Sequence, residues 1–450
     1  MIKMSELTYT KKNIYDETKD LAGINALNDR YIAFLNACRT ERQSTAFFAA
    51  EAEKHGFRPL DFKAPLKAGD KFYAVNRNKA IFLGVMGNDP EKDGIHISAA
   101  HIDSPRLDLK PQPLCEDSGI ALLKTHYYGG IKKYQWTALP LDMVGVAVTR
   151  DGKTVELSDS GYNFCITDLL PHLAADQVTK TLGKAIEGED LRILCGSIAD
   201  KDASEDKVKY TVLKLLNERY GITERDLISA EISFVPQLPA QSIGIDESFV
   251  GAYGQDDRVC AWTAFEALMT AKPSGRTLLV ALVDKEETGS DGVTGMQSMF
   301  FDMMIDKLCE GKNRHLCCVN SKCLSADVNA AFDPIYPSVQ DKQNCSILGC
   351  GPTVTKYTGA RGKSGTSDAS AETMAYFANL FDDHGVIWQS GLLGKVDQGG
   401  GGTVAKYVAN RNIDTIDIGV GLLSMHAPYE ISSKADVYET VRAFRTFMED

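Results

Sequence analysis

Short apolar runs alternate with helical stretches along much of this chain, and this alternation constrains its fold more than any other feature. The runs 94–103, 277–283 and 413–421 have the length and composition of buried strands. The stretches 259–271 and 370–380 are typical of helices. Strands that alternate with helices predict an α/β fold, in which helices flank a mostly parallel sheet. In such a sheet, ligands bind at the carboxyl ends of the strands.

A change in sequence pattern divides the chain into an α/β part and an inserted part. From 104 to 241, prolines such as Pro105 and Pro140 punctuate short β-like runs such as 144–148. We therefore expect an α/β domain whose first part is 1–103 and whose second part is 242–450, with a mainly-β domain inserted at 104–241. A set of elaborate loops is the alternative for the inserted span.

Composition excludes several classes of function. The 450 residues carry a formal net charge of −12, which disfavours non-specific binding to nucleic acid or to an anionic membrane. The N-terminus shows no secretory signal, and every apolar run is far shorter than the roughly 20 residues of a membrane helix. The 11 cysteines include no C-x-x-C pair. We expect reduced thiols in a cytoplasmic protein that binds neither nucleic acid nor membrane.

A histidine and an aspartate close the run 94–103. His101 and Asp103 are two residues apart, so in a strand their side chains point to the same side. A metal-binding histidine commonly donates its other ring N–H to a carboxylate, and Asp103 can be that partner. A structural His–Asp pair is the alternative.

Three carboxylates follow the run 277–283, at Asp284, Glu286 and Glu287. Like charges this close raise one another's pKa, and a bound cation relieves the repulsion. One glutamate can then bind a metal while its neighbour remains a general base. A solvated acidic turn is the alternative.

Further metal-ligand candidates lie at other predicted strand ends and turns. Asp256 and Asp257 precede a helix, where one of them is either an N-cap or a carboxylate that bridges two metals, with its neighbouring Asp and Arg258 holding it in place. Asp327 and His426 complete the set. Nitrogen and oxygen ligands of this mix suit a pair of divalent ions such as Zn, Mn or Co.

Two glycine-containing motifs do not predict a nucleotide site. Gly362-Lys363-Ser364 is similar to the end of a phosphate loop, but Tyr357 stands where that loop requires glycine. No strand leads directly into the run Gly399–Gly402. We expect this run to form a flexible or closely packed loop near the site.

Four motifs together resemble a known family. The segments 101–108 (HIDSPRLD), 284–290 (DKEETGS), 325–327 (SAD) and 424–426 (SMH) occur in the order of the M18 metallo-aminopeptidases, the aspartyl aminopeptidase group. The likeness covers essentially the whole chain, including the inserted span. It implies a di-metal exopeptidase fold that removes single N-terminal amino acids from peptides with a free N-terminus.

The resemblance implies a role for each candidate residue. One metal would be held by His101 and Asp327, and the other by Glu287 and His426, with Asp256 as the bridge. Asp257 remains the alternative bridge. Glu286 would be the general base, and Asp103 would orient His101. Two divalent ions are implied, zinc above all, with manganese or cobalt as alternatives.

The resemblance also implies partners and a substrate pocket. The inserted domain would be a dimerisation domain, and the chain would assemble as a tetrahedral dodecamer of dimers. His172 would reach the active site of a neighbouring subunit, and Lys356 would be a cation of the substrate pocket. The segments 132–141 and 394–403 depart from the usual family pattern and resemble the bacterial type-1 branch. These departures leave the preferred N-terminal residue open.

Two other functions compete with this hypothesis. An amidohydrolase or deacylase on the same scaffold would use similar ligands, and it would accept substrates blocked at the N-terminus. A non-catalytic assembly protein could retain the architecture, but it would have no need of a complete ligand set and base.

Overall fold

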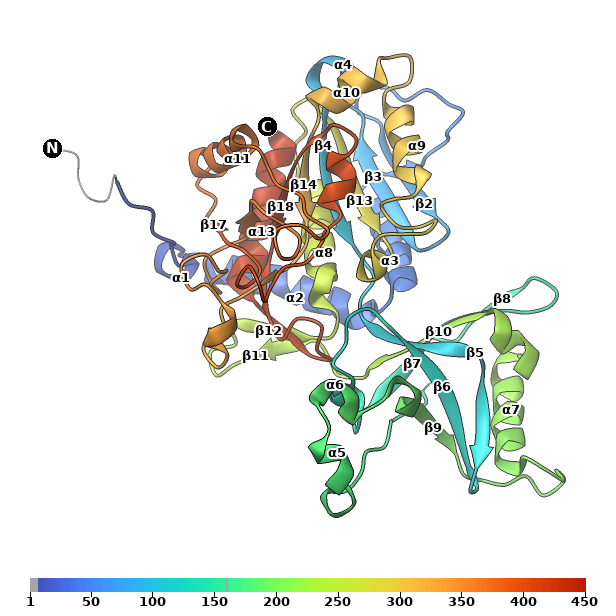
Figure 1. Cartoon of the computed structure of the whole chain (residues 1–450). Helices are drawn as coiled ribbons and strands as arrows, with labels where there is room; N and C mark the ends of the chain where they lie inside the picture. The colour runs from blue at the N-terminus through green and yellow to red at the C-terminus, as the bar shows by residue number, and fades with distance from the viewer. Residues whose placement is uncertain (1–6, 159–160) are drawn as a thin grey trace. The chain divides into compact units, whose positions relative to one another are not determined.

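The computed structural model describes residues 7–158 and 161–450, which form two compact units. The first unit holds 7–103, 240–425 and 430–450. The second holds the described parts of 104–239 together with 426–429. Each unit is built around its own sheet (Figure 1).

A nine-stranded sheet forms the centre of the first unit. Its four middle strands, β13, β4, β14 and β18, run parallel, whereas β3 and β16 pair antiparallel with the outer two of these. The predicted α/β fold with a mostly parallel sheet is confirmed. In spatial order the strands are β1 (Arg58–Pro59), β2 (Lys71–Asn76), β3 (Ala80–Val85), β13 (Thr277–Val283), β4 (Ile95–His101), β14 (Lys322–Ala326), β18 (Asp414–Gly419), β16 (Thr353–Thr355) and β17 (Gln389–Ser390).

The middle strands are buried on both faces, which explains their continuous apolar composition. Their register aligns Val283 at the end of β13 with His101 at the end of β4. The residues that follow these strands therefore emerge at one edge of the sheet.

Helices cover both faces of this sheet and enclose two separate hydrophobic cores (Figure 1). One core packs against α2 (Leu21–Ala37), α3 (Glu41–Lys54), α8 (Gln255–Thr270), α11 (Ala371–Asp383) and α13 (Lys434–Glu449). The other packs against α9 (Met299–Leu308), α10 (Arg314–Asn320) and α12 (Ala405–Ala409). The short helices α1 (Ile14–Glu17) and α4 (Pro90–Asp93) complete the helical layer.

A second, five-stranded sheet also belongs to the first unit. The strand of this sheet that comes last in the sequence, β20, leads directly into α13. The apolar stripe of α13 packs into the first core. The order is β11 (Gln241–Ile243), β12 (Phe249–Ala252), β20 (Glu430–Ser433), β19 (Gly421–Leu423) and β15 (Asn329–Ala330).

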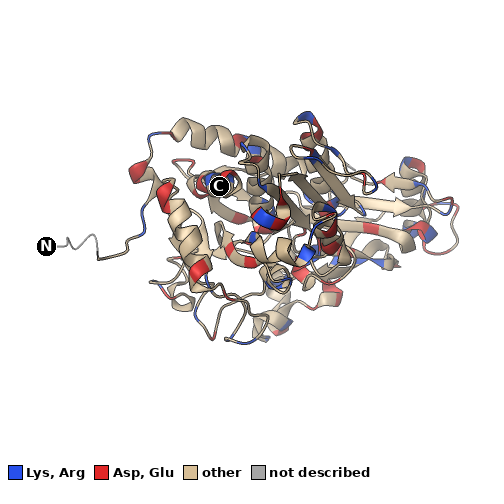
Figure 2. Cartoon of the chain, turned by 90° about the horizontal axis from the view of Figure 1, so that it is seen from above, with Lys and Arg blue, Asp and Glu red and all other residues tan. Residues whose placement is uncertain are grey.

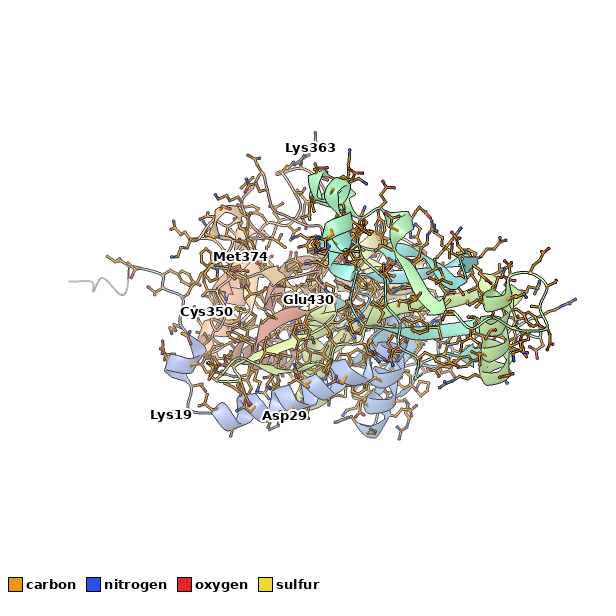
Figure 3. The ribbon with its side chains drawn as sticks, turned by 90° about the horizontal axis from the view of Figure 1, so that it is seen from below. Lys19, Asp29, Cys350, Lys363, Met374 and Glu430 are labelled. Atoms are coloured by element: carbon orange, nitrogen blue, oxygen red, sulfur yellow. The ribbon has the colours of Figure 1, made fainter. Side chains whose placement is uncertain are left out.

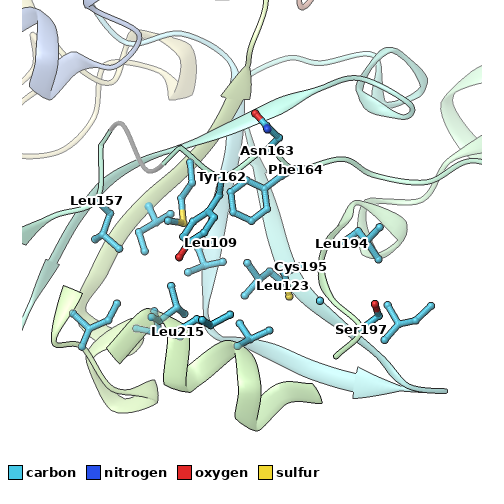
Figure 4. A pocket seen from close by; sticks show the side chains of 18 residues that line it. Leu109, Leu123, Leu157, Tyr162, Asn163, Phe164, Leu194, Cys195, Ser197 and Leu215 are labelled. Carbon is cyan, nitrogen blue, oxygen red and sulfur yellow. The ribbon is translucent and has the colours of Figure 1, made fainter. Parts of the chain in front are cut away.

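The second unit is an antiparallel six-stranded sheet with one long helix, α7 (Lys207–Tyr220). A cavity of about 470 Å³, lined mainly by aliphatic side chains, lies between α7 and this sheet (Figure 4). The short helices α5 (Ala175–Thr179) and α6 (Leu182–Ala185) form a separate excursion. In order the strands are β8 (Thr154–Glu156), β7 (Leu141–Val148), β10 (Ala230–Pro236), β5 (Arg106–Asp117), β6 (Ile120–Tyr128) and β9 (Arg192–Gly196).

The described residues also show where charged residues and cysteines lie and how apolar the helices are. Acidic and basic residues are interspersed along the elements (Figure 2). Among residues 7–158 and 161–450, no helix combines the length and apolar character needed to cross a bilayer. All eleven cysteines lie within the described residues, where each is a free thiol.

Candidate metal centre

Three predicted acidic residues of the first unit converge on the imidazole of His101. His101 ends β4, and its Nε2 lies 3.3 Å from Oδ1 of Asp256 in the first turn of α8. The same nitrogen lies 3.8 Å from Oδ1 of Asp327, which directly follows β14, and 3.8 Å from Oε2 of Glu286. These side chains come together because β4, β13 and β14 are parallel and end at one edge of the sheet.

Asp103 ties His101 to the turn that carries the two glutamates. Nδ1 of His101 lies 3.1 Å from the carbonyl oxygen of Asp103 and 3.3 Å from its Oδ1. Because a carbonyl only accepts, Nδ1 carries the proton and donates it, so Nε2 is the nitrogen that faces the carboxylates. The Asp103 carboxylate also accepts the backbone N–H groups of Glu286 and Glu287, each at 3.2 Å. Asp103 is fully buried, so it fixes both partners in a water-poor setting.

Crowded carboxylates dominate the electrostatics. Burial, reinforced by Asp327, raises the pKa of Glu286 to about 8. Burial acts to lower the pKa of His101, but hydrogen bonds with carboxylates, that of Asp103 foremost, outweigh burial and raise this pKa well above its ordinary value. A cluster with this excess of acid is costly by itself, and a divalent cation would supply the missing positive charge.

The donor atoms fit such a cation. His101, Asp256 and Asp327 each offer a ligand atom, and these atoms lie within 4.8 Å of one another. Asp256 and Glu287 also offer carboxylate oxygens within 4.8 Å of each other. One imidazole nitrogen with carboxylate oxygens, mostly buried and set on rigid strand ends, is a donor set that zinc accepts.

The surroundings of Asp256 differ from the sequence-based interpretation in the role of Arg258. The backbone at Asp256 and Asp257 is not helical, although both residues lie within the bounds of α8, so regular helical geometry begins only after them. Arg258 donates to the backbone carbonyls of Gly254, Tyr253 and Cys38, so it holds the chain ahead of the helix and not the Asp256 carboxylate.

Glu430, which the sequence analysis did not identify, makes the contact to Asp256 instead. Its Oε2 accepts the backbone N–H of Asp256 at 3.1 Å. Glu430 begins β20 and is only 1% exposed, within the body of the first unit (Figure 3). Asp257 is also fully buried, and burial raises its pKa well above the ordinary value.

Asp417 is a second acid that the sequence analysis missed. It lies on β18, where Oδ1 accepts from the Ser325 hydroxyl at 2.9 Å and Oδ2 from the Thr403 hydroxyl at 3.0 Å. Burial, reinforced by Asp327, raises its pKa to about 7. Asp417 and Asp327 both line a cavity of about 460 Å³ within the first unit.

The glycine run forms part of the wall of that cavity. Gly400 has a positive φ of 111°, and a Cβ there would lie 2.2 Å from the carbonyl oxygen of Gly359. Only glycine fits this approach, as expected for a closely packed loop near the site.

Three further predicted residues remain, and two of them, His426 and His172, belong to the second unit. His426 belongs to the second unit, where its Nδ1 lies 2.7 Å from the carbonyl oxygen of Gly130, which assigns ligand chemistry to Nε2. His172 lies exposed in the 3-10 turn Pro171–Leu173 of the second unit. Lys356 follows β16 with Nζ 5.1 Å from the Tyr357 ring centroid, and it does not line the cavity beside Asp327.

Comparison with known proteins assigns the family. A family profile described as "Aminopeptidase I zinc metalloprotease (M18)" matches residues 34–448. The chain belongs to the M18 family. The M18 match includes residues of the second unit and of all three segments of the first, so the inserted span is part of the family architecture.

Close relatives share nearly the full length. A "Probable M18 family aminopeptidase 1" of Clostridium acetobutylicum is 48% identical over 99% of this chain and 100% of its own. The crystal structure of the M18 aminopeptidase of Thermotoga maritima has 43% identity and a TM-score of 0.95, covering 98% of this chain and 100% of that one. The yeast mApe1 dodecamer, at 22% identity and a TM-score of 0.75, covers 94% of this chain and 96% of its own, and shares the fold.

Proposed function

We propose that this protein is a metal-dependent aminopeptidase that removes single amino acids from the free N-terminus of peptides. The observation that carries the proposal is the convergence of Asp256, Asp327 and Glu286 on Nε2 of His101, in a chain of the M18 family. Ligands for a metal and a candidate base thus lie within a few ångströms of one another.

We assign ligands for two divalent ions. The family description favours zinc, and manganese or cobalt are the alternatives. His101 and Asp327 would hold one ion, Glu287 and His426 the other, with Asp256 shared. The donor distances within the first unit support the first set and the Asp256–Glu287 pair. When bound, divalent ions polarise the scissile carbonyl and lower the pKa of a water to about 7.

Glu286 is proposed as the general base. Its carboxylate would take the proton of the attacking water and deliver it to the nitrogen of the leaving amine. Asp103 acts through other residues, because it accepts the Glu286 and Glu287 N–H groups and orients His101. We therefore assign Asp103 as a positioning residue.

The surplus of buried carboxylates supports the proposed preference for a free N-terminus. A substrate ammonium group carries positive charge into an acidic site, whereas an acylated amine carries none. A deacylase on the same scaffold would show the opposite preference, so N-acyl substrates separate the two functions.

Assembly and location are part of the proposal. We propose that 1–103 and 242–450 form the catalytic domain and that 104–241 forms a dimerisation domain. The protein would be a homo-oligomer, with the tetrahedral dodecamer of dimers as the specific form. The dodecamer reported for yeast mApe1 supports this.

The exposed apolar segment 169–173, which contains His172, also supports assembly. Leu169, Leu170 and Leu173 are 53%, 49% and 68% exposed, more apolar surface than a solvated turn needs. In the oligomer, His172 would reach a neighbouring active site. Sedimentation of wild-type protein and of the double variant Leu170→Asp, Leu173→Asp tests the assembly. Equal sedimentation of the two proteins would refute this role for the segment.

Free thiols at all eleven cysteines favour a cytoplasmic setting.

The experiment for the activity uses chelator-stripped protein to which Zn, Mn or Co is returned. The substrates are unblocked and N-acetylated aminoacyl anilides of Asp, Glu, Leu, Lys and Ala. We expect metal-restored cleavage confined to the unblocked set. Release of acetate from the acetylated set would establish the deacylase, and no cleavage with any metal would favour the non-catalytic alternative.

A further inference from the structure

The cavity next to Asp327 is a pocket within a single unit. It measures about 460 Å³, and Asp327, a proposed metal ligand, forms part of its wall. Apolar side chains from Leu392, Leu393 and Val396 and several threonines form other parts. Its position beside the candidate metal centre makes it the place for the side chain of the N-terminal residue.

The charges that line this cavity differ sharply in burial. Asp417 is 5% exposed and is held by two hydroxyl groups. The described cations of the lining, Arg361 and Lys395, are exposed, and so is Asp368. Water screens the exposed charges, whereas a buried charge acts through a medium of low dielectric constant.

We propose that Asp417 is a specificity-determining residue that excludes acidic side chains from this pocket, so that the enzyme prefers neutral N-terminal residues. The inference rests on the proposed aminopeptidase function. Asp327 would be neutralised by its metal, which leaves Asp417 as the buried carboxylate that meets the incoming side chain. The described cations of the lining are solvated, so they attract an acidic side chain only weakly.

The test compares substrates of equal shape and different charge. The kcat/KM of wild-type enzyme is measured at pH 8 on glutaminyl and glutamyl anilides. We expect wild type to favour glutamine by about tenfold or more, the size of one uncompensated like-charge contact in a partly buried site. Asp417→Asn keeps the shape and removes the charge, so it should reduce the Gln:Glu ratio several-fold.

A matched control uses the exposed acid of the same cavity. Asp368→Asn should leave the Gln:Glu ratio within about twofold of wild type, because solvent screens that carboxylate. If D417N does not fold, inhibition of wild-type enzyme by free glutamine and free glutamate gives the same comparison. A wild-type preference for glutamate, or equal ratios in D417N and wild type, would overturn the role of Asp417 while leaving the aminopeptidase intact. No hydrolysis of any unblocked substrate would instead overturn the proposed function, and this inference with it.

Discussion

Replacement of Glu286 by glutamine separates catalysis from metal binding. The change is isosteric, and the backbone N–H of residue 286 can still donate to Asp103 at the observed 3.2 Å. It removes the carboxylate whose pKa burial raises to about 8 and thus the group that takes up the proton. A general base contributes about 10²- to 10⁴-fold, and we expect the upper part of this range because one carboxylate serves both the water and the leaving amine. A loss of about 10³- to 10⁴-fold in kcat corresponds to about 4 to 5.5 kcal/mol.

The assay is kcat for an unblocked leucyl anilide, with zinc content measured on the same sample. Glu287→Gln is the matched control, because residue 287 occupies the same turn and is a proposed ligand. We expect E286Q to keep its metal and lose turnover, and E287Q to lose metal. If E286Q retained most of the wild-type kcat, the assignment of the base would be wrong.

Three further predictions concern other parts of the structure. Asp103→Asn should weaken zinc binding by about 10- to 100-fold, as loss of an outer partner of a histidine ligand typically does, and titration against a chelator of known affinity would show it. Burial raises the pKa of Asp436 to about 7, so the folded state holds a proton that the unfolded state has lost above pH 4, and its ionisation lowers stability as pH rises toward and through 7. The Tm of Asp436→Asn relative to wild type should therefore increase from pH 5 to pH 8, and an unchanged difference would contradict this. Gly145→Ala should lower the Tm of the second unit strongly, because φ is 153° and a Cβ would lie 2.0 Å from the carbonyl oxygen of Glu231, whereas Gly152→Ala, with open space around it, should cost only about 1 kcal/mol of backbone strain; similar Tm values for the two variants would refute the packing argument.

The parts of the fold that could be predicted are those whose signal is local. The run 277–283 is apolar because β13 is buried on both faces, and its bounds are those of the strand. His101 ends a strand of the same kind and Asp103 follows it closely, so the sequence could predict that both lie at the edge of the sheet. The periodicity of apolar residues therefore predicted the fold class, and the acidic residues at strand ends predicted where the candidate site lies.

The contacts that could not be predicted join residues far apart in the chain. Glu430 meets the backbone of Asp256 across 174 positions, and Asp417 meets Ser325 across 92. Neither acid lies in a motif, and only the folded sheet brings them to the site. The expectation that Arg258 holds the Asp256 carboxylate in place was wrong for a similar reason. The two residues are close in sequence, but the guanidinium of Arg258 donates its hydrogen bonds to backbone carbonyls.

The most direct measurement of the central claim follows the products of one peptide by mass spectrometry. Metal-stripped protein and zinc-restored protein are each incubated with a heptapeptide of neutral residues and with its N-acetylated form. The account predicts stepwise loss of single residues from the N-terminus of the free peptide, only after zinc is restored, and no change in the acetylated peptide. Cleavage without metal, internal cleavage, or equal attack on the acetylated peptide would contradict it.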